Sequence, residues 1–449
     1  MTHLLVIGGS DAGISASLRA RELDPGVDVT MVVADAYPNF SICGIPFYLS
    51  GETPDWHDLA HRTREEIEAS GLSLRLETRA VKLDVSSRVA TLLGNRGTEE
   101  RCPYDKVVVA TGATPIRPPI EGIEAEGVHV LHTMDDTFSL GERLKSTSSA
   151  VIVGGGYIGL EMADALTHRG IGVTLLEQAP AVMTTVDVEL GEIVGRTLRD
   201  HGVVAQTSAL VKRIERSANV LEVSGEGFEP VVGDVVLVVV SVRPDTELAE
   251  AAGIELGVRG AIRVDRSMQT SAPGVLAAGD CVETWHRILE RPSYMPLGTT
   301  AHKQGRIAGE NALGGKREFQ GSLGTQVVKV FDLAVARTGL RHIEAEEAGF
   351  DPLTAQFEAW DHKVYYPGAQ RMTIRTTGDR DGRLLGAQIV GDYRGQVAKR
   401  VDVFAAALYS GMSVDELSDL DLSYTPPLSS PWDPVQMAAQ NWSQSLADA

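Results

Sequence analysis

Cys43 is the residue of this chain whose type and surroundings best suit redox chemistry. It is followed by Gly44, Ile45 and Pro46, a series that suits a turn into a helix. A thiol near a helix N-terminus has a depressed pKa and reacts as the thiolate. Cys102 and Cys281 have no comparable context, and we expect both to be inert buried residues. The sequence therefore predicts a single reactive thiol.

A glycine-rich turn in the middle of the chain has the spacing of a dinucleotide site. Gly154, Gly156 and Gly159 complete a GxGxxG pattern after the apolar run 150–153. These glycines permit a tight turn and let backbone N–H groups approach a pyrophosphate at a helix N-terminus. Glu177 follows Gly159 by eighteen residues, and no Arg or Lys occurs in the four residues after it. Because this carboxylate accepts hydrogen bonds from ribose hydroxyls and repels a 2′-phosphate, we expect NADH here rather than NADPH.

A similar turn near the N-terminus lacks one glycine. Gly8 and Gly13 follow the apolar run 4–7, but Ser10 stands where the second glycine is usual. A side chain at that point would crowd a pyrophosphate. Asp35, twenty-two residues after Gly13, is the candidate partner for a ribose. The alternative is that Asp35 only begins a polar turn.

The elements that would position these residues form three units. The two glycine turns begin 146 residues apart, which is about one domain. After residue 324 the pattern changes to short strands and then a helix near 395–408, with no glycine turn. We expect an α/β fold with two Rossmann-like dinucleotide-binding domains and a C-terminal α+β dimerisation domain. The predicted limits are 1–116 with 250–324 for the first domain, 117–249 for the second and 325–449 for the third.

The composition of the chain limits the classes of molecule that it is expected to bind. The net charge of −20 repels nucleic acid and anionic lipid, so neither is expected to bind. No apolar run approaches the roughly 18–20 residues that span a bilayer, and the first residues enter a strand at once. The three cysteines are far apart and form no zinc pattern, so we predict no metal site and a reducing, cytoplasmic location.

Several separated motifs fall in a recognisable order. They are Thr111-Gly112, Gly279-Asp280, the segment 40–48 around Cys43, Lys303-Gln304-Gly305-Arg306, Tyr365-Tyr366-Pro367-Gly368 and Tyr424-Thr425-Pro426-Pro427. In this order the chain resembles the flavoprotein pyridine nucleotide-disulfide oxidoreductases. It is most similar to the single-cysteine branch, which comprises coenzyme A disulfide reductases, coenzyme A persulfide reductases, NADH oxidases and NADH peroxidases.

The resemblance implies where the cofactors bind. FAD would lie at the first turn, held by Gly8, Gly13, Asp35, Thr111, Gly112, Gly279 and Asp280. In that family the counterpart of Asp280 binds the ribityl or phosphate region of the flavin. NAD(P)H would lie at the second turn, and electrons would pass from it through the flavin to Cys43.

The resemblance also implies a homodimer with shared active sites. Tyr424, and one of Tyr365 or Tyr366, would reach toward the Cys43 of the other subunit. The alternative for these tyrosines is ordinary interface packing. A two-cysteine relative would carry its second cysteine five residues after the first, where this chain has Tyr48. Oxidised Cys43 would therefore be held as a mixed disulfide with a small thiol, a persulfide or a sulfenic acid.

At some positions this chain differs from the residues that are usual in the single-cysteine branch. Asp11 replaces the His that is usual in oxidases and peroxidases, although an Asp beside the flavin can still hold a proton. Ser15 and Arg19 remain candidates for binding a coenzyme A substrate. Glu22 and Ile42 weaken that site, because Glu22 repels phosphate and Ile42 cannot hydrogen-bond a pantetheine amide.

Three hypotheses follow. The leading one is an NADH-dependent reductase of a small disulfide or persulfide, with the coenzyme A disulfide class favoured. The second is an NADH oxidase that reduces oxygen through a Cys43 sulfenic acid. The third, of another class, is an FAD reductase of an electron-transfer protein, in which Cys43 would be incidental.

Overall fold

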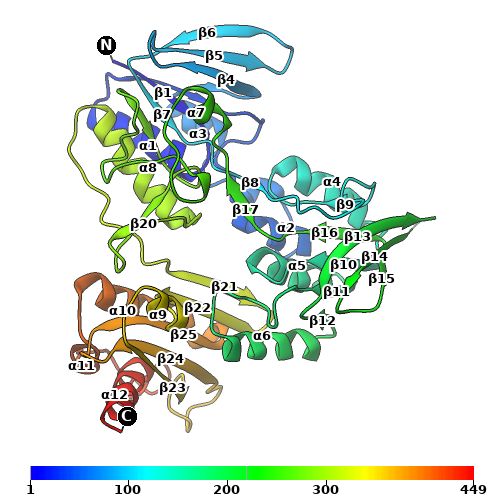
Figure 1. Cartoon of the computed structure of the whole chain (residues 1–449), viewed down its shortest axis with the longest axis vertical. Helices are drawn as coiled ribbons and strands as arrows, with labels where there is room; N and C mark the ends of the chain where they lie inside the picture. The colour runs from blue at the N-terminus through cyan, green and yellow to red at the C-terminus, as the bar shows by residue number, and fades with distance from the viewer. Residues whose placement is uncertain (1, 219, 449) are drawn as a thin grey trace.

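The computed structural model describes residues 2–218 and 220–448, which form three units. In Figure 1 the first unit lies at the top, the second at the right and the third at the bottom. The first unit is built on a parallel sheet of order β18-β7-β1-β2-β3. Its strands are β1 (His3–Ile7), β2 (Asp28–Val32), β3 (Ser73–Arg75), β7 (Lys106–Val109) and β18 (Val275–Ala277). A three-stranded antiparallel sheet adjoins it, made of β4 (Thr78–Asp84), β5 (Val89–Gly94) and β6 (Glu99–Pro103).

Two helices from distant parts of the sequence, α1 (Asp11–Leu23) and α8 (Gly298–Ala312), pack against each other in this unit. Glycines permit the contact, because a Cβ added at Gly305 or Gly309 would lie 2.2 Å from a backbone carbonyl oxygen of α1. The start of α8 is thereby fixed beside the first glycine turn.

The second unit repeats the parallel plan, with sheet order β12-β11-β10-β16-β9. Its strands are β9 (Val128–His129), β10 (Ser149–Val153), β11 (Gly172–Leu176), β12 (Val204–Gln206) and β16 (Val235–Val238), and its helices are α4 (Met134–Leu144), α5 (Tyr157–His168) and α6 (Val188–Asp200). An antiparallel sheet of β13 (Leu210–Ser217), β14 (Val220–Glu226) and β15 (Val231–Gly233) completes it. Strands β8 (Ala113–Pro115) and β17 (Val242–Pro244) pair antiparallel where the chain passes between the first and second units (Figure 1).

The third unit is an antiparallel sheet of order β21-β22-β25-β24-β23 covered by helices. Its strands are β21 (Gln326–Val330), β22 (Leu333–Gly339), β23 (Pro352–Trp360), β24 (Arg371–Asp379) and β25 (Leu384–Asp392), and its helices are α9 (His342–Glu347), α10 (Val397–Ser410), α11 (Val414–Ser418) and α12 (Pro434–Ala447). Phe404 of α10 and Trp442 of α12 are fully buried against the sheet. The predicted fold class, two Rossmann-like units with a C-terminal α+β unit, is confirmed.

Short elements connect the units and place Cys43. The segment after β2 forms the 3₁₀ turn η1 (Ile42–Gly44) and then α2 (Ile45–Ser50). Helix α2 packs against α5 of the second unit, and Arg169 Nη1 donates a hydrogen bond of 2.9 Å to the Leu49 carbonyl. Cys43 therefore lies close to the junction of two units. In the part of the chain that the structure describes, no helix is long and apolar enough to cross a membrane.

Candidate functional site

The two glycine turns have nearly the same geometry. Gly8 and Gly154 have φ values of +116° and +113°, which an L side chain rarely adopts. A Cβ at Gly13 would lie 1.9 Å from the Gly8 carbonyl oxygen, and one at Gly159 would lie 1.9 Å from that of Gly154. The turns thus close only because these four positions carry no side chain. Each turn leads into a helix, α1 or α5, whose N-terminus suits a pyrophosphate.

Ser10 does not disturb the first turn. Its φ and ψ are −88° and −164°, close to the −82° and −168° of Gly156 at the matching point of the second turn. A Cβ at Gly156 would meet nothing within 4 Å, and Ser10 is exposed. The backbone at this point accepts a side chain without strain, so the missing glycine is no obstacle to the first turn.

The residues around the first turn fit FAD. Burial, with a contribution from Asp11, raises the pKa of Asp280 to about 6, and its carboxylate accepts no hydrogen bond from the described residues. A half-buried acceptor with no partner in the described chain suits the hydroxyls of a ribityl chain. Asp35 lies beyond β2, where one of its oxygens accepts a 2.8 Å hydrogen bond from the Tyr37 N–H and the other is available to a ribose. Burial also raises the pKa of Asp35.

The remaining FAD candidates hold the backbone around the turn. Thr111 Oγ1 donates a 2.6 Å hydrogen bond to the Asp245 carbonyl, and Gly112, at φ +76°, accepts one from the Asp245 N–H. Gly279, at φ +90°, donates its N–H to Gln304 Oε1 at 3.0 Å. These contacts explain why Thr111 and both glycines are needed for the local geometry.

Glu177 is held in the orientation that a ribose site requires. It is 9% exposed, and its two carboxylate oxygens accept hydrogen bonds of 2.7 Å from the N–H groups of Gly155 and Ala179. The carboxylate is therefore fixed against the glycine turn, and each oxygen keeps a lone pair for a ribose hydroxyl. This arrangement fits NADH.

Cys43 is exposed, yet its thiol is surrounded by acidic groups. Desolvation raises the pKa of Cys43, and the charges of Glu161, Asp11 and Asp280 raise it further. The expectation of a depressed thiol pKa is therefore wrong for the groups that the chain itself supplies. The physical reason is that desolvation disfavours the thiolate, and that the charges acting on the sulfur are three carboxylates and no cation.

Asp11 lies between two elements of the site. It is the first residue of α1, and a Cβ at Gly298, the first residue of α8, would lie 2.8 Å from Asp11 Oδ2. The same carboxylate acts on the pKa values of Cys43 and Asp280. The structure thus brings Asp11, Asp280 and Cys43 into one electrostatic neighbourhood.

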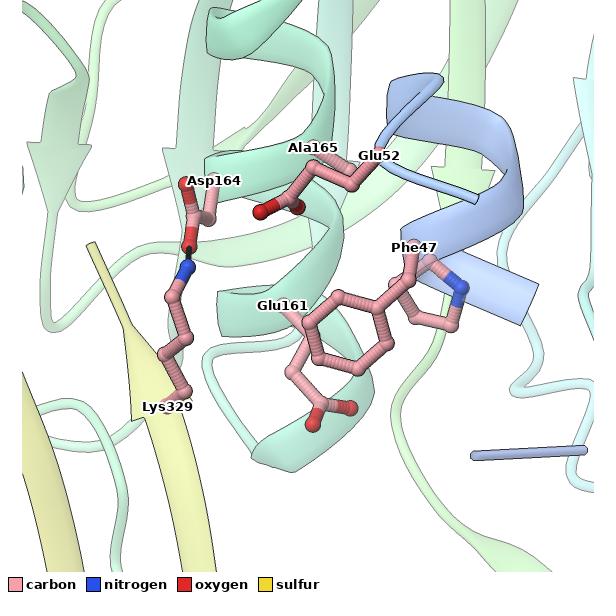
Figure 2. Close-up of a pocket in the computed structure, with 7 residues that line it drawn as sticks. Phe47, Glu52, Glu161, Asp164, Ala165 and Lys329 are labelled. Atoms are coloured by element: carbon pink, nitrogen blue, oxygen red, sulfur yellow. Dashed lines mark hydrogen bonds and ion pairs between the residues drawn. The ribbon is translucent and has the colours of Figure 1, made fainter. Parts of the chain in front are cut away.

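Two further residues of this neighbourhood, Tyr157 and Glu161, were missed in the sequence. They lie one helical turn apart on α5, so they share a face of the helix. Burial, followed by the charge of Asp164, raises the pKa of Glu161 to about 7. Figure 2 shows Lys329 of β21 reaching Asp164, at 2.9 Å, while the Glu161 carboxylate lies apart from that ion pair beside Phe47. The sequence signal that could have identified both residues is their position in the first two turns of the helix that follows the glycine turn.

The three candidate tyrosines lie on neighbouring loops of the third unit. The Lys363 N–H donates to the Pro426 carbonyl at 3.3 Å and joins the two loops. Contact with Tyr365 raises the pKa of Tyr424. Tyr365 is 74% exposed, and Tyr366 and Tyr424 are 43% and 44% exposed. Exposed aromatic rings in one region are typical of a surface that another protein covers.

The candidate substrate residues are less available than expected. Arg19 makes ion pairs with Glu310 at 2.6 Å and Glu22 at 3.0 Å, which offset its charge. Ser15 is buried and shares a 2.8 Å hydrogen bond with His302. Ile42 is exposed directly beside Cys43. Only Ile42 of the three is free to contact a substrate at the thiol without breaking an existing bond.

Comparison with known proteins agrees with this geometry. The family model "Pyridine nucleotide-disulphide oxidoreductase" matches residues 2–305, and its dimerisation domain matches residues 325–434. The chain belongs to this family. It is 33% identical to the NAD(P)H coenzyme A polysulfide/persulfide reductase of Pyrococcus horikoshii, with 97% of each chain covered. It is 31% identical to an NADH oxidase of Methanocaldococcus jannaschii, with 99% of each covered. The solved structure of an NAD-dependent persulfide reductase from A. fulgidus has a TM-score of 0.95 and 37% identity, covering 100% of this chain and 84% of that one.

Family membership confirms the predicted enzyme class and cofactors. The protein is an FAD-dependent oxidoreductase that uses NAD(P)H, with a dimerisation domain at residues 325–434. The individual site residues stay predictions, which the geometry above makes testable.

The second turn offers a pair of variants that separate folding from binding. Gly159→Ala places a methyl group 1.9 Å from a carbonyl oxygen and is expected to lower the Tm. Gly156→Ala meets open space, so the Tm should stay constant while the KM for NADH rises by about tenfold or more. Differential scanning fluorimetry and steady-state kinetics measure the two effects. Unchanged NADH kinetics in Gly156→Ala would show that the pyrophosphate does not lie at this turn.

The pKa of Glu161 predicts a pH-dependent effect on stability. Folding raises this pKa from 4.5 to about 7, so the folded state loses stability as the pH rises across that window. Glu161→Gln removes the loss, which is at most about 3 kcal/mol before solvent screening. The variant should therefore gain Tm over the wild type at pH 8 but not at pH 4.5. An equal difference in Tm at both pH values would contradict the assignment.

Proposed function

We propose that the protein is an NADH-dependent reductase of a low-molecular-weight disulfide or persulfide, with the coenzyme A disulfide class favoured. The observation that carries the proposal is the isolation of one exposed thiol. Cys43 is exposed, whereas Cys102 and Cys281 are 8% and 0% exposed and lie in the core. No second cysteine can resolve oxidised Cys43, so a substrate thiol has to occupy that role.

The reaction at sulfur follows from this arrangement. FAD supplies a two-electron relay between the nicotinamide and the sulfur. The Cys43 thiolate attacks one sulfur of a disulfide RSSR, forming a mixed disulfide and releasing RS⁻, which takes up a proton. Two electrons and a proton from NADH and solvent then cleave the mixed disulfide and release the second RSH. The sum is RSSR + NADH + H⁺ giving 2 RSH + NAD⁺.

The tyrosines suit the role of proton donors in a homodimer. A tyrosine phenol keeps its proton at neutral pH and can donate it to a leaving thiolate. Both rings are exposed on the dimerisation domain. We propose that they face the Cys43 of the partner in a homodimer with shared active sites. The three unpaired cysteines favour a reducing, cytoplasmic location.

The names of the relatives support two candidates for the molecule that accepts the electrons. One relative is named as a coenzyme A polysulfide/persulfide reductase and another as an NADH oxidase. Oxidase activity through a Cys43 sulfenic acid is therefore the second candidate. Reduction of an electron-transfer protein leaves the exposed Cys43 without a role, and we do not favour it.

The preference for NADH depends on Glu177. Glu177→Ala removes a carboxylate that receives ribose hydroxyls and repels a 2′-phosphate. We expect the ratio of kcat/KM for NADH to that for NADPH to fall by about tenfold or more. Glu222→Ala, which changes an exposed carboxylate on β14 of the same unit, is the control and should keep the ratio. A wild type that prefers NADPH would contradict the assignment of Glu177.

The acceptor can be identified by anaerobic reoxidation. We expect NADH-reduced wild type to be reoxidised by coenzyme A disulfide, with two thiols released per NADH. Cys43→Ser should lose this step while flavin reduction by NADH and turnover with an artificial dye stay within about twofold, because the nucleotide sites are intact.

Cys102→Ser is the control, since that thiol is buried and distant in sequence from the site. Reoxidation by oxygen alone, with water or peroxide as product, would replace the reductase with the oxidase candidate. Loss of FAD from Cys43→Ser would assign Cys43 a structural role instead.

A further inference from the structure

Tyr157 lies where the second nucleotide turn meets the neighbourhood of Cys43. It is the first residue of α5, directly after Gly156. Glu161, one turn later on the same face, acts on the pKa values of both Tyr157 and Cys43. Tyr157 therefore lies between the turn that would hold a dinucleotide and the group of charges around Cys43.

A single hydroxyl group fixes the Tyr157 phenol. Thr185 Oγ1 donates a hydrogen bond of 3.0 Å to the Tyr157 oxygen, and this bond lowers the phenol pKa, although burial raises it overall. Because Tyr157 accepts this bond, its own O–H proton is left free to point elsewhere. The contact therefore fixes the position of the phenol oxygen.

Thr185 is itself held by the third unit. Arg337 of β22 donates a hydrogen bond of 2.8 Å to the Thr185 carbonyl, and Arg341 donates bonds of 2.8 and 3.3 Å to the carbonyls of Thr184 and Val186. Glu344 pairs with both arginines, at 2.7 Å from Arg337 and 3.0 Å from Arg341.

The other end of the loop is tied to the nucleotide turn. The Met183 N–H donates a 2.8 Å hydrogen bond to the Gly155 carbonyl, and Met183 has a φ of +56°. The loop 183–187 thus spans the distance between the glycine turn and the third unit. Its three central carbonyls are bonded to arginines, which leaves the loop little freedom to move.

We propose that Thr185 is a positioning residue, which orients the Tyr157 phenol at the nicotinamide dinucleotide site and is held in place by Arg337 of the C-terminal unit. The inference rests on the proposed NADH site but is independent of the final acceptor. The C-terminal unit then has a second role beside dimerisation, because through Arg337 and Thr185 it positions the Tyr157 side chain where NADH would deliver its electrons.

A double-mutant cycle tests the proposal. Thr185→Val keeps the shape of the side chain and removes the hydroxyl, whereas Thr185→Ser keeps the hydroxyl. We expect Thr185→Val to weaken NAD⁺ binding or slow flavin reduction by roughly 3- to 10-fold, and Thr185→Ser to stay within about twofold. Calorimetric titration with NAD⁺ and anaerobic stopped-flow reduction by NADH measure these effects without any acceptor. In the Tyr157→Phe background, Thr185→Val should have no further effect.

The contribution of the C-terminal unit needs its own control. Arg337→Gln should reproduce the effect of Thr185→Val and add nothing to it. Arg375→Gln breaks another link to the same loop, the 2.9 Å ion pair with Asp187, but does not contact Thr185. It should therefore leave NAD⁺ binding unchanged, while the Tm reports any general loosening of the interface.

Two results would overturn the proposal. An effect of Thr185→Val that persists in the Tyr157→Phe background would show that Thr185 does not act through the phenol. Wild-type behaviour of Thr185→Val or Tyr157→Phe would show that the phenol does not serve the site. Failure of coenzyme A disulfide as acceptor would leave both measurements intact, so the two proposals fail separately.

Discussion

The structure depends on close backbone contacts at glycines. At Gly13 and Gly159 a helix start approaches a carbonyl oxygen so closely that an added Cβ would lie 1.9 Å from it. At Gly305 and Gly309 the same constraint brings α8 against α1, at 2.2 Å from the added Cβ. These contacts place the helix N-termini at the ends of the parallel strands, where a pyrophosphate is held. They also place Asp11 and Asp280 beside Cys43, since both residues belong to the same packed region.

The charged groups that act on the Cys43 thiol are all negative. Glu161, Asp11 and Asp280 all favour the neutral form of Cys43, and desolvation acts in the same direction. The neutral thiol is therefore favoured over the thiolate, which is the reactive species. The raised pKa values of Glu161, about 7, and Asp280, about 6, mean that this region exchanges protons near neutral pH. A reaction at sulfur that takes up protons is compatible with such surroundings.

Contacts between the units connect these features. Lys329 of the third unit pairs with Asp164 of the second, and Arg337 and Arg341 bind the loop 183–187. The sheet of the third unit thus supports the helix and loop that carry Tyr157, Glu161 and Thr185. The same unit also carries Tyr365 and Tyr424, whose side chains are exposed at the surface. One unit therefore acts on the nucleotide site within the chain and presents aromatic rings outside it.

Much of this organisation was predictable, because repeated local patterns specify it. Two strand–glycine–helix motifs and the acid after each second strand indicated two Rossmann-like units, and the motif order indicated the family and both cofactors. The limits of the domains and the roles of single residues stay predictions. Ser10 replaces a glycine of the pattern, and the structure shows that the backbone angles there match those of Gly156. A composition pattern does not report φ and ψ, so only the structure could settle that point.

The sequence by itself determined the fold class, the nucleotide turns and the presence of one candidate thiol, because each depends on residues close together in the chain. Only the tertiary structure decided the pKa of Cys43, the ion pairs that occupy Arg19 and the hydrogen bond from Thr185 to Tyr157. Each of these depends on groups far apart in sequence that packing brings within a few ångströms. Electrostatic and hydrogen-bond energies vary steeply over such distances, and for that reason they cannot be read from spacing along the chain.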